Sequence, residues 1–125
     1  MSTTSENLEE HYQRGSAHRN VGEYDRAISE FRYVLDRQPD HVNARIGLAL
    51  VYGFVGMFDE SLAELKRALE TDPSSVDALL YLAKTCCMLG LYDEARDHFN
   101  RILELQPGHP EAKKQLSYLA AEETA

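Results

Sequence analysis

The side chains with the clearest chemical potential are two adjacent cysteines, Cys86 and Cys87, and five histidines. Cysteine and histidine are the usual ligands of zinc, but a structural zinc site needs four ligands converging on one point. The histidines fall in four different predicted helices or turns, at His11, His18, His41, His98 and His109. A disulfide between neighbours in a helix would be strained. The sequence therefore predicts no metal site, with Cys86 a small buried hydrophobic side chain and Cys87 nearer the solvent.

Catalytic chemistry finds no support in the spacing of the reactive side chains. We find no glycine-rich phosphate loop, no nucleophile elbow, and no histidine and carboxylate spaced so that a helix would bring them together in a pocket. The acidic pairs Asp59-Glu60 and Asp93-Glu94 fall in the first turn of predicted helices, where negative charge complements the helix dipole. We therefore predict that the chain is not an enzyme and uses no cofactor.

Composition limits the possible partners. The chain has 125 residues, of which 43% are hydrophobic, and its 13 basic and 21 acidic side chains give a formal charge of −8. This charge argues against a nucleic-acid partner, because phosphate backbones attract basic surfaces. No apolar run of about 18 residues could span a membrane, and the first residues, Met1-Ser-Thr-Thr-Ser-Glu, lack the basic start and apolar stretch of a targeting peptide. We expect a single cytoplasmic domain without membrane insertion.

The elements that position these side chains repeat along the chain. Pro39, Pro73 and Pro107 follow one another at intervals of 34 residues. The same interval separates three glycines, three aspartates and three leucines: Gly22, Gly56 and Gly90; Asp25, Asp59 and Asp93; Leu35, Leu69 and Leu103. Residues 42–75 share eleven identities with residues 76–109 without a gap, where unrelated segments would share roughly two. The chain is therefore built from an internal repeat.

Each repeat predicts two helices joined by a tight turn. A glycine ends the first helix, because a residue without Cβ adopts the left-handed conformation that caps a helix. A proline ends the second, because it lacks an amide donor and restricts the residue before it. Asp40 and Ser74 lie where N-caps are expected. The predicted helices cover residues 5–20, 24–37, 41–54, 58–71, 75–88 and 92–105, and Pro110 suits the first turn of a seventh, in which Leu116 and Leu119 face inward.

The repeat resembles a known family in its detailed residue pattern. The third unit carries Leu79, Leu82, Ala83, Cys86, Ala95, Phe99 and Pro107, and the second carries Arg45, Leu48, Ala49, Tyr52, Ser61, Leu65 and Pro73. With its 34-residue period, this pattern resembles the tetratricopeptide repeat (TPR). The first unit departs from it at His11, Arg14 and His18. The resemblance implies an all-α, right-handed solenoid of three helix-turn-helix units (8–41, 42–75 and 76–109), with an N-terminal extension (1–7) and a solvating capping helix and tail (110–125).

The resemblance also implies a concave inner surface, lined by the first helix of each pair, that recognises other proteins. In the middle unit Ile46, Leu50 and Phe54 form an i, i+4, i+8 stripe on a different side from the core residues. A helix that is apolar all round should be covered all round, so we expect a ligand on this stripe. Gly47 and Gly53 cost about 1 kcal/mol each relative to alanine, and the backbone of a ligand could approach them. The alternative is that neighbouring helices already cover the stripe.

From these residues we predict a non-enzymatic interaction module, an adaptor, scaffold or chaperone-like protein, that holds an apolar segment of a partner protein. Its expected peptide site, at least partly exposed, comprises Tyr12, Ser16, Arg19, Asn43, Ile46, Leu50, Phe54, Leu80, Tyr81, Lys84 and Met88. The alternative is a structural protein that forms a homo-oligomer through this groove or through the open ends of the repeat.

One specialised use of the family is not expected here. Some members clamp the C-terminal carboxylate of heat-shock chaperones with lysines, asparagines and an arginine. The matching positions in this chain are Tyr12, Ser16, Gly47, Asp77 and Tyr81. None of them supplies the positive charge, and Asp77 would repel a carboxylate, so we predict that chaperone tails are not the ligand.

Overall fold

The computed structural model describes residues 4–124, and these residues form seven α-helices without a strand. The helices are α1 (Thr4–Asn20), α2 (Tyr24–Arg37), α3 (Val42–Phe54), α4 (Phe58–Thr71), α5 (Val76–Met88), α6 (Tyr92–Leu105) and α7 (Pro110–Thr124). The first six agree with the predicted ranges to within one residue at each end. The all-α prediction is confirmed, and none of the described helices is long and apolar enough to cross a lipid bilayer.

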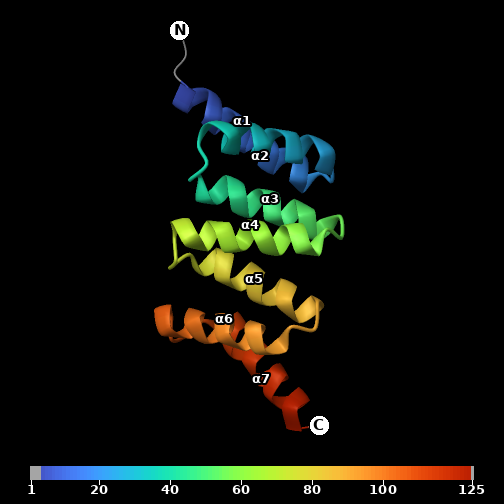
Figure 1. The fold of residues 1–125 in the computed structure, drawn as a ribbon, viewed down its shortest axis with the longest axis vertical. Helices are drawn as coiled ribbons and strands as arrows, with labels where there is room; N and C mark the ends of the chain where they lie inside the picture. Colours follow the sequence, from blue (N-terminus) through green and yellow to red (C-terminus); the bar gives the residue numbers. More distant parts are fainter. Residues whose placement is uncertain (1–3, 125) are drawn as a thin grey trace.

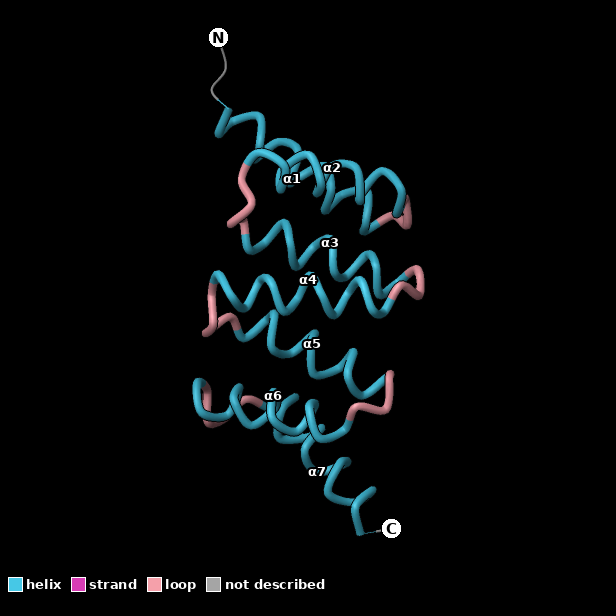
Figure 2. Tube along the Cα trace, in the orientation of Figure 1, coloured by secondary structure: helices cyan, strands magenta, loops and turns pink. Residues whose placement is uncertain are grey.

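The helices follow one another in a single row from the N-terminus to the C-terminus (Figure 1). Three antiparallel hairpins, α1–α2, α3–α4 and α5–α6, are joined by short turns (Figure 2). Each hairpin packs against the next through α2–α3 and α4–α5, and the leading helices α1, α3 and α5 also contact one another in order. The last helix, α7, packs on α6. This is the architecture of a solenoid, in which each unit is stabilised by its neighbours.

The same turn closes all three hairpins. Gly22, Gly56 and Gly90 have φ angles of 81°, 83° and 76°, in the region that favours glycine, as the sequence predicts. The residue after each glycine donates its backbone N–H to a carbonyl in the last turn of the leading helix, at 2.8 Å in every case. These bonds satisfy carbonyls that the end of the helix would otherwise leave without a partner.

The predicted N-caps are wrong by one residue. The side chains that cap α3 and α5 belong to His41 and Ser75, not to Asp40 and Ser74. His41 Nδ1 accepts a hydrogen bond from the Ala44 amide at 2.9 Å, and Ser75 Oγ accepts one from the Ala78 amide at 3.2 Å. His109 is the equivalent residue before α7, since its Nδ1 accepts from the Ala112 amide at 3.1 Å. A neutral imidazole nitrogen is an acceptor like a hydroxyl oxygen, which allows histidine at this position.

The ring of Phe31, fully buried, lies between two glycines of different helices. A Cβ atom placed on Gly15 of α1 would lie 2.8 Å from the Phe31 ring, and one placed on Gly47 of α3 would lie 2.6 Å from it. Both separations are shorter than carbon atoms tolerate. The expectation that Gly47 admits the backbone of a ligand is therefore wrong, because the Phe31 ring occupies that space.

A buried ion pair fills an apolar position of the second unit. Arg45 of α3 is only 6% exposed. It donates one hydrogen bond to Glu64 of α4 at 2.6 Å and another to the Pro39 carbonyl at 2.7 Å. The guanidinium group therefore links its own helix to the next one and to the preceding turn, and its aliphatic part fills the position that the family pattern gives to a large side chain.

The first unit meets the solvent with polar side chains in place of apolar ones. His11 stacks on Tyr33 with 3.7 Å between the ring centroids, and its Nδ1 lies 2.5 Å from Glu30. Arg14 donates to the same carboxylate at 2.7 Å, and Arg37 lies 3.4 Å from the centre of the Tyr33 ring. Burial raises the pKa of Glu30, but the hydrogen bonds with His11 and Arg14 outweigh it and hold this pKa below its usual value.

The two ends of the chain are helical as far as they are described. Helix α1 already begins at Thr4, so the predicted N-terminal extension is helical from there, and residues 1–3 lie outside the described part. At the other end, Leu119 is buried and Leu116 is half-buried in α7, as the sequence predicts. The division into units at the predicted boundaries is our proposal.

The position of the Phe31 ring between Gly15 and Gly47 leads to a stability prediction. Gly47→Ala should lower the free energy of unfolding by about 1–3 kcal/mol, because the new methyl group overpacks against the buried ring, although alanine favours helix by about 1 kcal/mol. Gly108→Ala is the matched control, since a Cβ there meets no atom within 4 Å. Urea denaturation of both variants measures the difference. Equal stability of Gly47→Ala and Gly108→Ala would contradict the assigned packing.

Candidate functional site

A hollow lies where α3, α4 and α5 meet. It has a volume of about 450 Å³. Helix α1 contributes a single residue to it, Arg19. The lining residues are Arg19, Ala49, Leu50, Gly53, Phe54, Phe58, Ser61, Tyr81, Lys84, Thr85 and Met88. We call this hollow the α3–α5 pocket.

The walls and mouth of the α3–α5 pocket are apolar. Leu50 and Tyr81 are half-buried and pack against the hydrophobic core. Phe54 and Met88, near the C-terminal ends of α3 and α5, are 60% and 64% exposed. The Phe54 ring lies 5.7 Å from the ring of Tyr24. Two large, exposed apolar side chains therefore flank a recess whose sides are fixed by the core.

Two of the three hydroxyl groups among the lining residues, those of Ser61 and Thr85, donate to the backbone. Ser61 Oγ donates to the Ala49 carbonyl at 2.8 Å, and Thr85 Oγ1 donates to the Tyr81 carbonyl at 2.8 Å. A Cβ atom on Gly53 would meet only Ser61 Oγ, at 3.8 Å, so there is ordinary space above this glycine. Because the Ser61 and Thr85 hydroxyl protons already have acceptors, the part of the pocket beside them favours an apolar group over a hydrogen-bonding one.

Both charged residues that line the pocket are basic. Lys84 Nζ lies 3.6 Å from a carboxylate oxygen of Glu111 on α7. A hydrogen bond from Gln115, followed by the charge of Lys84, lowers the pKa of Glu111. Arg19 provides the other positive charge from α1. The charged side chains that line the α3–α5 pocket are therefore positive in a chain of net charge −8, and the Lys84 charge is paired with Glu111.

The structure brings together six of the eleven predicted site residues. Arg19, Leu50, Phe54, Tyr81, Lys84 and Met88 line the α3–α5 pocket. Tyr12, Ser16, Asn43 and Leu80 do not line it, and the rings of Phe31 and His41 lie beside Tyr12, 6.0 Å and 5.2 Å away. That any of these ten residues binds a peptide remains a prediction.

The eleventh residue, Ile46, contradicts the expectation of a continuous exposed stripe. It is 7% exposed and belongs to the hydrophobic core. Residues four apart on an α-helix differ by about 40° in direction, so the stripe winds by about 80° from Ile46 to Phe54. Neighbouring helices cover its first residue, and only Leu50 and Phe54 reach the pocket.

Sequence reasoning left five lining residues out of the predicted site: Ala49, Gly53, Phe58, Ser61 and Thr85. It considered only the leading helix of each pair, whereas Phe58 begins the trailing helix α4. Thr85 follows Lys84 on α5 and is buried, so a search for exposed helix faces did not select it. Phe58 could have been found from its position two residues after the turn glycine Gly56, because the short turn keeps it beside Phe54.

A second group of reactive side chains lies outside the pocket. Cys86 of α5 is fully buried, as predicted, and burial raises the pKa of its thiol to about 11. Its Sγ atom, a Glu94 carboxylate oxygen and a His98 ring nitrogen all lie within 4.8 Å of one another. Burial lowers the pKa of His98. We expected no histidine and carboxylate that a helix would bring together in a pocket. Glu94 and His98, one turn apart on α6, do come together, although neither lines the α3–α5 pocket.

Two sequence profiles described as tetratricopeptide repeat match the chain, over residues 55–117 and 12–53. The chain belongs to the tetratricopeptide repeat family. Each TPR unit is a helical hairpin, in agreement with the three hairpins described above. A search of curated protein sequences found no match.

Solved structures share this fold at low sequence identity. The first TPR domain of Spaghetti (RPAP3), bound to the HSP90 peptide SRMEEVD, is 21% identical, with a TM-score of 0.91 and coverage of 98% of both chains. MamA is 16% identical, with a TM-score of 0.89, over 97% of this chain and 71% of its own. The TPR domain of Arabidopsis OM64 is 20% identical, with a TM-score of 0.88, over 94% of this chain and 97% of its own. At these identities the matches show a common TPR fold.

The contrast between the buried and exposed parts of the stripe is testable. Ile46→Ala should lower the free energy of unfolding by about 2–4 kcal/mol, because it leaves a cavity in the core. Met88→Ala should change it by less than about 0.5 kcal/mol, as expected for an exposed side chain. Chemical denaturation compares the two variants. A large loss for Met88→Ala would mean that the mouth of the pocket is part of the core.

Proposed function

We propose that this TPR protein is a non-enzymatic interaction module, an adaptor or chaperone-like protein, that binds an apolar segment of a partner in the α3–α5 pocket. The observation that carries the proposal is the exposure of Phe54 and Met88 on either side of an apolar recess. Single exposed apolar side chains are common on protein surfaces. Their grouping around a pocket of about 450 Å³ is typical of a binding site.

The positive charges at the rim of the pocket indicate which charge the ligand should carry. Arg19 and Lys84 are the charged residues that line the pocket, in a chain whose formal charge is −8. Complementary charges at the border of an apolar contact fix the register and favour the correct partner. The proposed ligand is therefore a segment in which a large apolar side chain enters the pocket and an acidic side chain beside it faces Arg19 and Lys84.

The TPR domain of Spaghetti, described as bound to an HSP90 peptide, supports peptide binding by this fold. The ligand of this chain should nevertheless differ from a chaperone tail. At the positions that would clamp a terminal carboxylate, Asp77 is exposed and negative, and Gly47 lies beneath the Phe31 ring. We propose that the protein binds an internal apolar–acidic segment and does not require a free C-terminus.

Peptide display on the purified chain tests this proposal. A library of random peptides should be enriched in sequences with a large apolar residue beside aspartate or glutamate. Phe54→Asp should abolish enrichment, because it places a charge at the apolar mouth, while the helical circular dichroism signal stays unchanged. Tyr118→Asp is the matched control, since Tyr118 is a 56% exposed aromatic of α7 that does not line the pocket.

The competing role, self-association, gives a different result in the same variants. A concentration-dependent dimer that Phe54→Asp converts to a monomer, with no peptide enriched on the wild-type chain, would overturn the proposal. Enrichment that persists in Phe54→Asp would also overturn it, because binding would then occur elsewhere. Analytical ultracentrifugation measures the mass across a range of concentrations.

Reversal of the rim charge tests the acidic part of the motif. In the double variant Arg19→Glu and Lys84→Glu, affinity for the enriched apolar–acidic peptide should fall about tenfold or more, since exposed charge pairs contribute up to about 1 kcal/mol each. Replacement of the acidic residue of the peptide by lysine should restore part of the loss. Fluorescence anisotropy measures both affinities. Unchanged binding would show that the rim takes no part in recognition.

A further inference from the structure

Cys86, Glu94 and His98 form a compact cluster that the peptide pocket does not use. The cluster spans two helices, with Cys86 on α5 and the other two residues one turn apart on α6. Cys86 is fully buried, His98 is half-buried and Glu94 is exposed. The Sγ atom of Cys86 lies 4.0 Å from Glu94 Oε2. One ligand atom of each residue lies within 4.8 Å of the other two.

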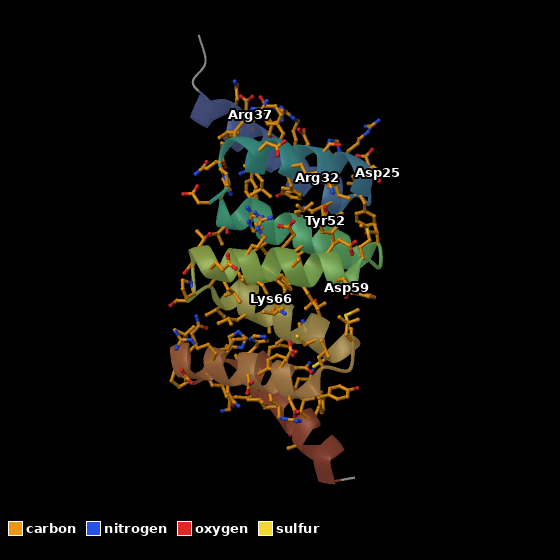
Figure 3. The ribbon with its side chains drawn as sticks, in the orientation of Figure 1. Asp25, Arg32, Arg37, Tyr52, Asp59 and Lys66 are labelled. Atoms are coloured by element: carbon orange, nitrogen blue, oxygen red, sulfur yellow. The ribbon has the colours of Figure 1, made fainter. Side chains whose placement is uncertain are left out.

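In the second unit a tyrosine occupies the position equivalent to Cys86. Tyr52 is the residue equivalent to Cys86, 34 positions earlier, and Arg32 of α2 donates to its hydroxyl at 2.5 Å (Figure 3). In the third unit the corresponding basic residue is Lys66 of α4 (Figure 3). A cysteine is much smaller than a tyrosine and has no hydroxyl to receive such a bond. The substitution therefore replaces an aromatic ring with a thiol beside an imidazole and a carboxylate.

These three groups are the donors that zinc prefers. Thiolate, imidazole and carboxylate bind Zn²⁺ at about 2.0–2.3 Å in tetrahedral sites, which places donor atoms about 3.3–3.8 Å apart. Cys86 Sγ and Glu94 Oε2 are 4.0 Å apart, and all three donor atoms lie within 4.8 Å of one another. The side chains of Glu94 and His98 have solvent on one side, so small rotations bring their donor atoms closer, while the buried backbone of α5 fixes Cys86.

We propose that Cys86 Sγ, a Glu94 carboxylate oxygen and a His98 ring nitrogen bind one zinc-like divalent cation between α5 and α6. On binding, the thiol releases its proton to solvent and coordinates as the thiolate, and a water molecule completes the tetrahedron. Such an ion joins the two helices of the third hairpin. It therefore stabilises the folded chain in proportion to its affinity.

The surrounding charges set the strength of the site. Glu94 and Asp97 place negative charge beside His98, which favours a cation. The ammonium group of Lys66 acts on both Cys86 and His98 from α4, and it opposes a cation. Lys66 is exposed, so its side chain can turn toward solvent when an ion binds. The cation affinity should accordingly increase when the charge of Lys66 is removed.

Cobalt(II) is a suitable probe, because its bond to a thiolate produces a near-ultraviolet charge-transfer band. The reduced wild-type chain should develop this band at one equivalent of cobalt, and zinc should displace it. Zinc should also raise the melting temperature. Glu94→Gln and His98→Asn should each lose the band and the thermal shift, and both are chosen because neither residue is fully buried. Lys66→Gln should lower the zinc Kd about fivefold.

The neighbouring cysteine provides the matched control. Cys87 lies on the same helix but outside the cluster, so Cys87→Ser should keep both the band and the thermal shift. Cys86→Ser should lose the band, with circular dichroism confirming that the variant is folded. Absence of a band in the wild type, or a band that survives both Glu94→Gln and His98→Asn, would overturn the proposed site. Loss of the band in Cys87→Ser would overturn the assignment of Cys86.

Discussion

The spacing between the first two hairpins depends on one aromatic ring. Phe31 lies between α1 and α3, and a methyl group on Gly15 or Gly47 would collide with it. At the next junction the equivalent residues are Leu65 and Tyr81, so a smaller residue on the trailing helix is matched by a larger one on the leading helix. Leu65 belongs to the core cluster, and Tyr81 packs against this cluster and also lines the α3–α5 pocket. At the first junction the aromatic ring comes from the trailing helix, and at the second it comes from the leading helix. The ring of Tyr81 therefore forms one wall of the pocket.

The repeat made the helices predictable, because glycine and proline act through local backbone geometry that does not depend on tertiary contacts. Gly22 could be assigned to a left-handed turn from its period alone, and its φ of 81° agrees. The N-caps were less predictable, since Asp40 and His41 are both acceptable next to a helix start. The choice between them depends on which side chain points at the free amides, and only the three-dimensional structure determines this.

Site residues were predictable where helix geometry alone determines their exposure, and unpredictable where packing between helices determines it. Phe54 lies at the C-terminal end of α3, where neighbouring helices cover it only in part and leave it 60% exposed, as its place on the sequence stripe indicated. Ile46 belongs to the same sequence stripe, but α3 lies inside the row and contacts helices on both sides (Figure 1). Phe58 and the Glu94–His98 pair escaped prediction for a related reason. Phe58 joins the pocket only when α4 folds back on α3, and the Glu94–His98 pair, which helix spacing alone brings together, meets Cys86 only when α6 folds back on α5.

Helix α5 connects the two sites that we propose. Tyr81, Lys84 and Met88 line the α3–α5 pocket, while Cys86 belongs to the cation cluster with α6. The stability of a repeat protein is approximately the sum of the stabilities of its units and of the interfaces between them. An ion that joins α5 to α6 would therefore stabilise the third hairpin without touching a ligand in the pocket. The proposed ion would not contact the half-buried residues that line the pocket. The ion would act on the pocket indirectly, because α5 would then open less often. Pocket residues that are already ordered lose less entropy when a peptide binds.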